Sequence, residues 1–439
     1  MRVFIAYFIV FTLVSCDKKD VFGNTVNKIP AISTISTFGG SKNDVAQAII
    51  NTNDGGYAIL GHTQSSDFDI NTKTNDSFDF WVLKFDSNHE LEWSKTFGGS
   101  NDDRGTNLVQ TNDNGFLITG FSRSSDGDIS ENAGNYDFWV AKLDVNGQLI
   151  WEKSFGYSGA DQSYAIKKIA NGGYLLGGSL DVTASGGQGN SKSQKHAGGD
   201  FWLIKIDENG NNLWSKYFGG QFTDILYDIE ETDSGDFILV GSSDSDDADI
   251  SNNIGSYDFW VLKVDKNGSK IWEKNFGGSQ ADEAFSIVKT SNNQFLIAGN
   301  SRSSDVNVSV TMGSSDIWLI KIDSDGNLLW EKSFGGSSFE IAKKIIKNNN
   351  QEYYIVGSSR SSDIGVLTNQ GNKDVWIISV NENGTINWQK SMGGTELDEA
   401  NSVIETNKNE IIVAGETWSF NGDISENKGF SDALIIKIK

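Results

Sequence analysis

Short runs of alternating apolar and polar residues cover most of the chain and recur with a spacing of roughly 58 residues. In the second copy the pattern predicts four strands, at residues 103–111, 116–122, 138–144 and 149–155. Asn-Gly turn signals end the first and third strands, and a long polar loop joins the second strand to the third. Four short antiparallel strands per repeat are typical of a propeller blade.

The seven copies are out of phase with the ends of the chain. Six copies end in a fourth strand such as residues 91–97, which Gly98-Gly99 follows, whereas the seventh reaches the C-terminus without such a strand. A matching strand, residues 32–38, stands near the N-terminus. We therefore predict an all-β, seven-bladed β-propeller of four-stranded antiparallel blades, closed by pairing of residues 32–38 with 433–439. An open solenoid, the alternative, needs capping repeats, and the sequence shows none.

Tryptophans recur in the middle of the third and fourth predicted strands. They are Trp81, Trp139, Trp202, Trp260, Trp318 and Trp376 in the third strands, and Trp93, Trp151, Trp214, Trp272, Trp330 and Trp388 in the fourth. Because they recur from blade to blade, we expect them to pack between neighbouring blades rather than to stack on a ligand.

The N-terminal segment has no repeat character. Residues 3–14 form an apolar run with one polar residue, which is too short to span a membrane and typical of a signal peptide. The following Leu-Val-Ser-Cys16 resembles the bacterial lipoprotein box, in which the cysteine is lipidated. The resemblance implies a signal peptide at 1–15, a lipid-anchored tether at 16–30 and a propeller at 31–439. An ordinary secretory signal with an incidental cysteine is the alternative.

Composition narrows the range of partners. The chain has 439 residues with 36 basic and 59 acidic side chains, a net charge of −23. This acidic surface argues against nucleic acid, whose phosphates need Lys and Arg. A single cysteine excludes intramolecular disulfides and cysteine-cluster metal sites, and only three histidines are present. We expect a monomer that touches a membrane through the lipid on Cys16.

The repeat motif is similar to one found in a known group of proteins. The string runs from Phe38 to Asp44, then Asp54 to Tyr57, Gly61, and Ser65 to Asp69. It resembles the propeller repeats of extracytoplasmic, Bacteroidetes-type lipoproteins. The resemblance implies export and a place on a bacterial membrane, at the periplasmic side of the outer membrane or at the cell surface.

Strand order puts the two short hairpins of each blade on one face and the long loops on the other. The long-loop face carries two repeated sets of acids. The inner-strand acids are Asp44, Asp103, Asp161, Asp224, Asp282, Glu340 and Asp398. The third-strand acids are Asp79, Asp137, Asp200, Asp258, Asp316, Asp374 and Asp432. A repeated acid suggests a repeated structural task, such as accepting backbone N–H bonds. An electronegative funnel formed by the inner-strand acids is the alternative.

The long loops also contain closely spaced carboxylates. These are Asp67, Asp69, Asp126, Asp128, Asp247 and Asp249, with Asn421 and Asp423 in the last copy. Calcium needs several hard oxygen ligands, so these pairs raise the hypothesis of a structural calcium ion. The full twelve-residue calcium-loop pattern is absent.

Seven equal blades cannot form one asymmetric site, so departures from the repeat point to function. The longest loop carries Lys192, Lys195 and His196. Three copies place an arginine after the second strand, where the last copy has Trp418; the arginines are Arg123, Arg302 and Arg360. We expect these loop residues to contact a polar ligand, such as a glycan, or a protein partner.

The sequence favours a lipid-anchored, non-enzymatic binding or scaffold protein. It has no Gly-x-Ser-x-Gly elbow, metal-binding histidine pair or phosphate loop. A polysaccharide-acting, glycoside hydrolase-like enzyme that uses carboxylates on the loop face is the alternative. Such an enzyme needs two acids in unlike environments, whereas acids repeated in every blade share one environment. A structural part of a larger surface complex is the third hypothesis.

The lipoprotein interpretation makes a direct prediction. The Cys16→Ala variant should leave the membrane fraction and appear in the soluble fraction, because it lacks the acylated thiol. Fractionation followed by immunoblotting measures this. Ser15→Thr, which retains the cysteine, is the matched control, and retention of Cys16→Ala in the membrane would contradict lipid anchoring.

Overall fold

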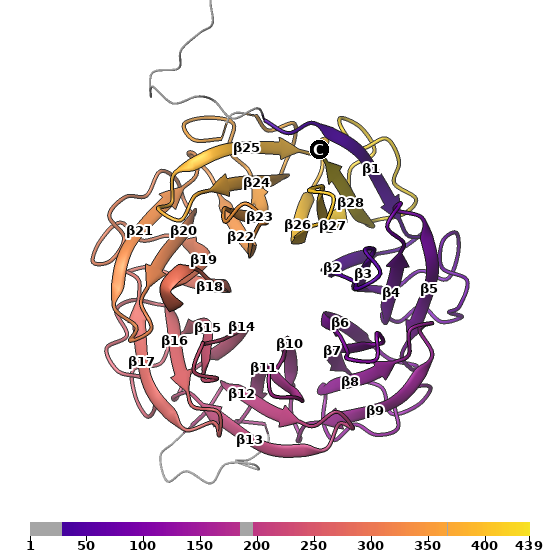
Figure 1. Ribbon diagram of the computed structural model, residues 1–439, viewed down its shortest axis with the longest axis horizontal. Coiled ribbons are helices and arrows are strands. Elements are labelled where there is room, and N and C mark those ends of the chain that lie inside the picture. Colours follow the sequence, from indigo (N-terminus) through magenta and orange to yellow (C-terminus); the bar gives the residue numbers. More distant parts are fainter. Residues whose placement is uncertain (1–28, 185–195, 367) are drawn as a thin grey trace, which may run out of the picture.

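The computed structural model describes residues 29–184, 196–366 and 368–439. Across these residues, 28 strands form seven four-stranded antiparallel sheets arranged as blades around a central axis (Figure 1). The predicted all-β, seven-bladed propeller is confirmed. The only helix in the described part is the 3-10 turn η1 (Ser291–Asn293), and no helix there is long and apolar enough to cross a membrane.

Each blade runs from an inner strand beside the axis to an outer strand at the rim; blade 1 is β2–β5, and blade 7 combines β26–β28 with β1. The inner strands are β2 (Asp44–Asn51), β6 (Asp103–Gln110), β10 (Gln162–Lys168), β14 (Asp224–Glu231), β18 (Asp282–Lys289), β22 (Glu340–Lys347) and β26 (Asp398–Glu405). The second strands are β3 (Tyr57–Thr63), β7 (Phe116–Ser122), β11 (Tyr174–Asp181), β15 (Phe237–Ser243), β19 (Phe295–Ser301), β23 (Tyr353–Ser359) and β27 (Ile411–Thr417). The third strands are β4 (Asp79–Phe85), β8 (Asp137–Leu143), β12 (Gly199–Ile206), β16 (Asp258–Val264), β20 (Asp316–Ile322), β24 (Asp374–Val380) and β28 (Asp432–Ile438). The outer strands are β1 (Ile32–Phe38), β5 (Leu91–Phe97), β9 (Leu149–Phe155), β13 (Asn212–Phe218), β17 (Lys270–Phe276), β21 (Leu328–Phe334) and β25 (Ile386–Met392).

Strand β1 closes the ring. It pairs antiparallel with β28, with Phe38 opposite Ala433. Ala31 and Lys439 exchange two backbone hydrogen bonds of 2.8 Å. In Figure 1 the indigo N-terminal strand lies beside the last, yellow strand of the chain. The predicted pairing of residues 32–38 with the C-terminal strand is confirmed, and it gives blade 7 its fourth strand.

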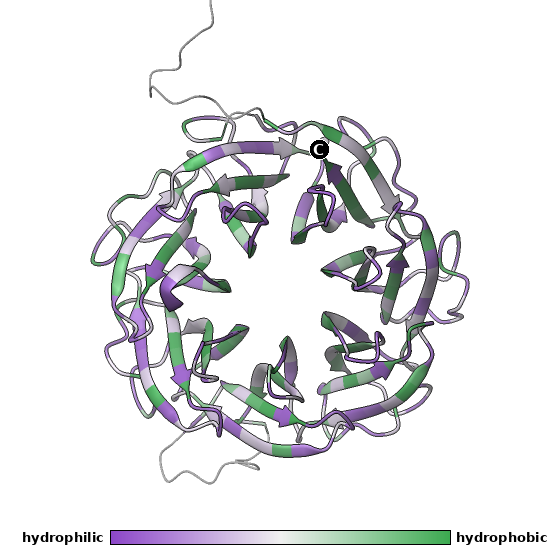
Figure 2. Cartoon of the chain, in the orientation of Figure 1, coloured by the Kyte–Doolittle hydropathy of each residue, from purple (hydrophilic) through white to green (hydrophobic). Residues whose placement is uncertain are grey.

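The third strands lie between neighbouring blades and are buried on both faces. Strand β16 is buried along its whole length. Its Phe259 ring packs edge-on against Trp318 of the next blade, with 4.7 Å between centroids, and the Trp260 indole donates to Glu273. Figure 2 shows long apolar stretches on the third strands and mixed character on the outer strands. The third-strand tryptophans are therefore core residues, and their polar N–H groups are satisfied.

Buried carboxyl groups hold the long-loop end of each inner strand. All seven inner-strand acids are fully buried. Asp44 accepts the Gly40 N–H at 2.6 Å, and Asp224 accepts the Gly220 N–H at 2.7 Å. The Ser65 hydroxyl also donates to Asp44 at 2.7 Å. Because loops cover these carboxylates, they tie the chain together and do not present their charge at the mouth of the channel.

At six of the seven junctions a glycine lies between the third-strand acid of one blade and the inner-strand acid of the next. A Cβ atom on Gly277 would lie 2.2 Å from Asp258 Oδ1 and 2.6 Å from Asp282 Oδ2. The same geometry surrounds Gly39 where the ring closes, between Asp432 and Asp44. Only glycine fits between two carboxyl groups in this way, which explains the first glycine of the repeated Gly-Gly pair.

Burial of these acids changes their protonation. Burial, reinforced by the neighbouring carboxylate, raises the pKa of Asp258 to about 6 and that of Asp161 to about 7. The pKa values of Asp79, Asp374 and Asp432 are also raised to about 6, chiefly by burial. The junctions between blades therefore bind protons in a pH range where free aspartates are ionised.

Ring closure predicts the effect of removing β1. A chain that starts at residue 39 should lose about 4 kcal/mol or more of unfolding free energy relative to one that starts at residue 29, because a strand ladder and the apolar side chains of Ile32, Ile35 and Phe38 are lost. Urea unfolding monitored by tryptophan fluorescence measures the difference. The chain starting at residue 29 should match the chain starting at residue 17, and equal stability of all three would contradict closure by β1.

The buried acids predict a stability maximum at mildly acidic pH. Between about pH 4 and pH 7 the folded chain holds protons on Asp258 and Asp161 that the unfolded chain has released, so the unfolding free energy falls as pH rises. Asp113 and Glu410 have pKa values lowered to about 2 by lysine partners and hydrogen bonds that outweigh the effect of burial, so their stabilisation is lost below about pH 4. We expect the melting temperature to peak near pH 4–5 and to decline toward pH 7.5.

Calorimetry across this pH range tests the expectation. Asp258 faces Asp282 and accepts the Ile254 N–H, and an asparagine at this position keeps an acceptor but cannot titrate. The Asp258→Asn variant should therefore show a shallower decline between pH 5 and 7.5. The exposed Asp126→Asn is the matched control and should keep the full decline. A wild-type melting temperature that rises over this range would contradict the prediction.

Candidate functional site

The Asp-x-Asp loops fold back onto the Gly-Gly-Ser segment of their own blade. In blade 1, Asp67 accepts the Ser41 N–H at 2.8 Å and Asp69 accepts the Gly39 N–H at 2.9 Å. The same contacts recur for Asp126, Asp128, Asp247 and Asp249. These carboxylates thus act as acceptors in a turn. Within residues 29–184, 196–366 and 368–439, no three His, Cys, Asp or Glu side chains come together as a metal site.

The loop residues expected to contact a ligand lie on the long-loop face of four different blades, each directly after a second strand. Arg123, Arg302 and Arg360 are exposed on blades 2, 5 and 6, and Trp418 is 40% exposed on blade 7. Arg123 and Arg360 lie over the rings of Tyr136 and Phe339, about 6 Å from the centroids. None of these four residues lines the central cavity. The structure places them on several blades rather than around one pocket.

His196 is buried at a junction between blades. Its Nδ1 lies 2.7 Å from Asp200 Oδ2. In blade 6 the backbone N–H of Gln370, at the equivalent position, donates to Asp374 at 2.7 Å. The histidine side chain therefore replaces a backbone donor in blade 3 and stabilises the loop. Lys195, like Cys16, lies outside the described residues.

One pair of acids near the channel mouth has unlike environments. Glu399 and Glu416 are directly opposite each other on β26 and β27. Burial would raise the pKa of Glu399, but Lys343 and Lys373 lower it below its usual range. Burial and the nearby Glu399 raise the pKa of Glu416, which also accepts a hydrogen bond from Trp418. Sequence analysis did not single out this pair, because the repeat carries no acid at the Glu416 position in the other blades.

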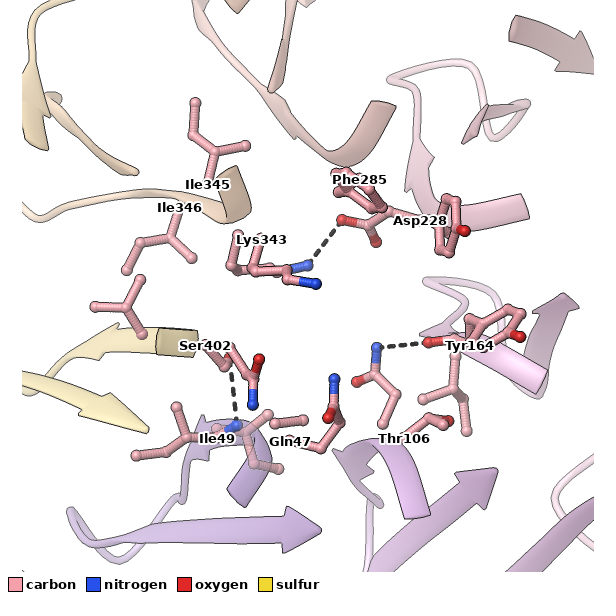
Figure 3. Close-up of a pocket in the computed structure, with 18 of the residues that line it drawn as sticks. Gln47, Ile49, Thr106, Tyr164, Asp228, Phe285, Lys343, Ile345, Ile346 and Ser402 are labelled. Carbon is pink, nitrogen blue, oxygen red and sulfur yellow. Dashed lines mark hydrogen bonds and ion pairs between the residues drawn. The ribbon is translucent and has the colours of Figure 1, made fainter. Parts of the chain in front are cut away.

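A cavity of about 880 Å³ occupies the middle of the ring and is lined by the inner strands (Figure 3). Every inner strand contains a β-bulge three residues after its acid, so that one residue has no partner on the second strand. A bulge re-aims the side chain of the extra residue, and here all seven extra residues line the cavity. We call them the bulge ring: Gln47, Thr106, Tyr164, Tyr227, Phe285, Lys343 and Asn401.

The bulge ring is strongly asymmetric. Three consecutive blades supply Tyr164, Tyr227 and Phe285, with ring centroids 5.4 and 4.9 Å apart, and these form an aromatic wall. Lys343 of the next blade places its Nζ 5.4 Å from the Phe285 ring. Figure 3 shows the aromatic side chains on one side of the cavity and Gln47 on another. The site thus joins an apolar surface to cationic and amide groups, as ligand pockets commonly do.

An ion pair lies next to the aromatic wall, between Lys344 and Asp228. Lys344 reaches past blade 5 to Asp228 of blade 4, with 2.7 Å between Nζ and Oδ2. Burial raises the pKa of Asp228, but Lys344, Ser286 and Lys167 outweigh it, so the net shift is downward. The bond appears as a dashed line in Figure 3. An ionised, fully engaged Asp228 is a positioning group for the wall rather than a general acid.

Sequence reasoning did not find the bulge ring. A period-2 strand pattern does not reveal one extra residue, because the flanking alternation resumes after it. A signal was present nevertheless. The residue three positions after each inner-strand acid varies from copy to copy, whereas the inner-strand acid before it and the third-strand acid after it recur in the repeat. The loops were predicted to carry the departures from symmetry, whereas the inner strands carry one at the bulge of every blade.

No protein-family model matches the chain. The regulatory protein FlaEY of Caulobacter vibrioides is 25% identical over 218 residues, which cover 46% of this chain and 22% of that protein. The match thus spans less than a quarter of that relative's length.

Solved structures are similar in fold. A protein of unknown function from Bacteroides caccae is 10% identical, with 71% of this chain and 89% of that chain covered and a TM-score of 0.42. One from Dyadobacter fermentans DSM 18053 is 11% identical, with coverages of 94% and 100% and a TM-score of 0.46. BBS1N in complex with ARL6DN is 6% identical, with coverages of 93% and 96% and a TM-score of 0.50. The chain is a seven-bladed β-propeller with similarity to bacterial proteins of unknown function, and the likeness concerns the fold alone.

Proposed function

We propose that this protein is a non-enzymatic binding protein, held outside the cytoplasm by the lipid on Cys16, which binds its ligand in the central channel. The bulge ring carries the proposal. It is the place where seven similar blades present aromatic, cationic, amide and hydroxyl side chains to one cavity, and recognition of one ligand needs such asymmetry.

The direction of β1 supports an outward-facing binding site. The strand begins at Ile32, beside Ile438, on the face of the short hairpins, and ends at Phe38, next to the long loops. The tether therefore joins the ring on the short-hairpin face. With Cys16 in the membrane, attachment at this face leaves the opposite, long-loop mouth of the channel uncovered by the tether's point of entry and accessible to a ligand.

The long-loop residues support binding in a secondary way. Arg360 and Trp418 follow the second strands of neighbouring blades on the long-loop face, but neither lines the central cavity. We therefore assign the primary contacts to the channel and keep the loop face as a surface for a glycan or protein partner. A polysaccharide-acting enzyme remains the second candidate, favoured by the unlike environments of Glu399 and Glu416.

A channel-filling variant tests the proposal. Gln47→Trp combined with Thr106→Trp places two indoles in the cavity from neighbouring blades and should abolish ligand signals on an array of oligosaccharides and peptides. Circular dichroism and the melting temperature establish that the ring is intact. Trp418→Ala is the matched control and should keep most of the binding.

The opposite pattern would assign binding to the loop face: signals that survive the double variant and disappear in Trp418→Ala. Release of reducing ends from a polysaccharide, lost in Glu416→Gln with binding retained, would favour the enzymatic candidate instead.

A further inference from the structure

The lining of the channel has an excess of positive charge, whereas the whole chain is acidic. The whole chain has a net charge of −23. The cavity lining nevertheless contains five cationic side chains and three anionic ones: Arg104, Lys167, Lys343, Lys344 and Lys347 against Asp228, Glu230 and Glu405. A local excess of positive charge inside an acidic protein attracts and orients an anionic ligand.

Two of these cations have only loose ionic partners. Lys344 and Lys167 form tight pairs with Asp228 and Glu230, at 2.7 and 2.8 Å. Lys343, by contrast, lies 3.5 Å from Glu399, whose closer contact is Lys373 at 2.8 Å.

Arg104 is the second loosely paired cation. Its guanidinium lies 3.7 Å from Asp102 and stacks 4.3 Å over the Phe78 ring. Its buried Nε has no hydrogen-bond partner among the described residues. The neighbouring His62 is uncharged at neutral pH, because burial and Arg104 lower its pKa to about 4. Arg104 therefore keeps donor capacity that the protein itself does not use.

These two cations flank the aromatic wall. Arg104 belongs to blade 2, the wall to blades 3, 4 and 5, and Lys343 to blade 6. The amides of Gln47 and Asn401 line the remaining side of the ring. The channel thus presents an apolar surface, a cation at each end of it, and neutral hydrogen-bonding groups opposite.

We propose that the channel binds a saccharide that carries carboxylate groups. This inference rests on the proposed function of the channel. The apolar face of a sugar ring stacks on Tyr227 and its neighbours, the hydroxyls bond to the amides, and the carboxylate lies against Lys343 or Arg104. A ligand with flat apolar faces, many hydroxyls and negative charge matches all three parts of the lining.

Other anions fit less well. A phosphate group is usually held by free backbone N–H groups of a glycine-rich turn, and no glycine is among the described residues that line the cavity. Nucleic acid meets an acidic outer surface before it reaches the channel. A small aromatic acid offers no hydroxyl to the amide of Gln47 and leaves that of Asn401 with only its bond to the Ala46 carbonyl, which costs binding free energy.

Titration calorimetry on the full propeller tests the proposal. The probes are oligogalacturonate, oligomannuronate and a hyaluronan fragment, each compared with its carboxyl-reduced form. At least one acidic probe should bind roughly tenfold more tightly than its reduced form. A charge-assisted hydrogen bond contributes about the free energy that corresponds to a tenfold change in affinity. Added salt should weaken the binding of the acidic probe and leave the affinity for the reduced form nearly unchanged.

Variants separate the two parts of the site. Lys343→Met should lower the affinity for the acidic probe roughly tenfold and leave the affinity for the reduced form unchanged. Glu399 keeps its closer ion pair with Lys373 in this variant, so the substitution removes only the cation that would face the ligand. Tyr227→Ala should weaken both forms roughly tenfold, and Tyr227→Leu, which keeps apolar volume without a flat ring, should do the same if the wall acts by stacking. Lys153→Met, on the exposed outer strand β9, is the matched control and should change neither.

The proposal is overturned if no acidic probe binds, if acidic and reduced forms bind equally, or if Lys343→Met and Lys153→Met behave alike. Its failure is distinct from failure of the proposed function. If a different array ligand binds the wild-type protein and its signal disappears in the channel-filling variant, the channel is the binding site and only the proposed class of ligand is wrong. When an acidic saccharide binds and the channel-filling variant retains it, the assignment to the channel is wrong as well.

Discussion

Ring closure is the constraint on which the rest of this structure depends. Each four-stranded sheet has two apolar faces, and both must be covered by a neighbouring blade. Blades at the ends of an open array would expose one face and a strand edge. Pairing of β1 with β28 removes this problem, because it completes blade 7 with a strand that leads directly into blade 1. Non-local pairing of the two chain ends thus secures the burial of the third strands everywhere in the ring.

Closure also fixes the junctions where neighbouring blades meet on the long-loop face. At six of the seven junctions the chain crosses between blades through a Gly-Gly pair, and the first glycine is flanked by two buried carboxyl groups such as Asp258 and Asp282. Burial of two adjacent acids is unfavourable when both are ionised. Backbone N–H groups and hydroxyls offset part of this cost by donating to the carboxylates, and a raised pKa offsets another part by keeping protons bound. Loop geometry therefore explains why the acid is repeated in every blade.

The sequence predicted the repeated features well, because repetition averages out local ambiguity. The strand bounds in the second copy, the closing strand and the core role of Trp260 all followed from patterns that recur. The site could not be predicted in the same way. The position of Tyr227 in the cavity depends on a bulge, and the approach of Lys344 to Asp228 depends on the curvature of the ring across blade 5. Neither is encoded in the pattern of one strand.

The bulge ring also shows how such a scaffold can vary its ligand without losing its fold. A residue such as Tyr227 has no partner on the second strand, so a change of side chain leaves the hydrogen-bond ladder unaffected. It faces the cavity rather than the core between blades, so its size is not fixed by close packing. The alternating residues beside it, such as Leu226, are buried in the core and have no such freedom. Variation in chemistry is therefore tolerated at one position per blade, and these seven positions converge on a single cavity.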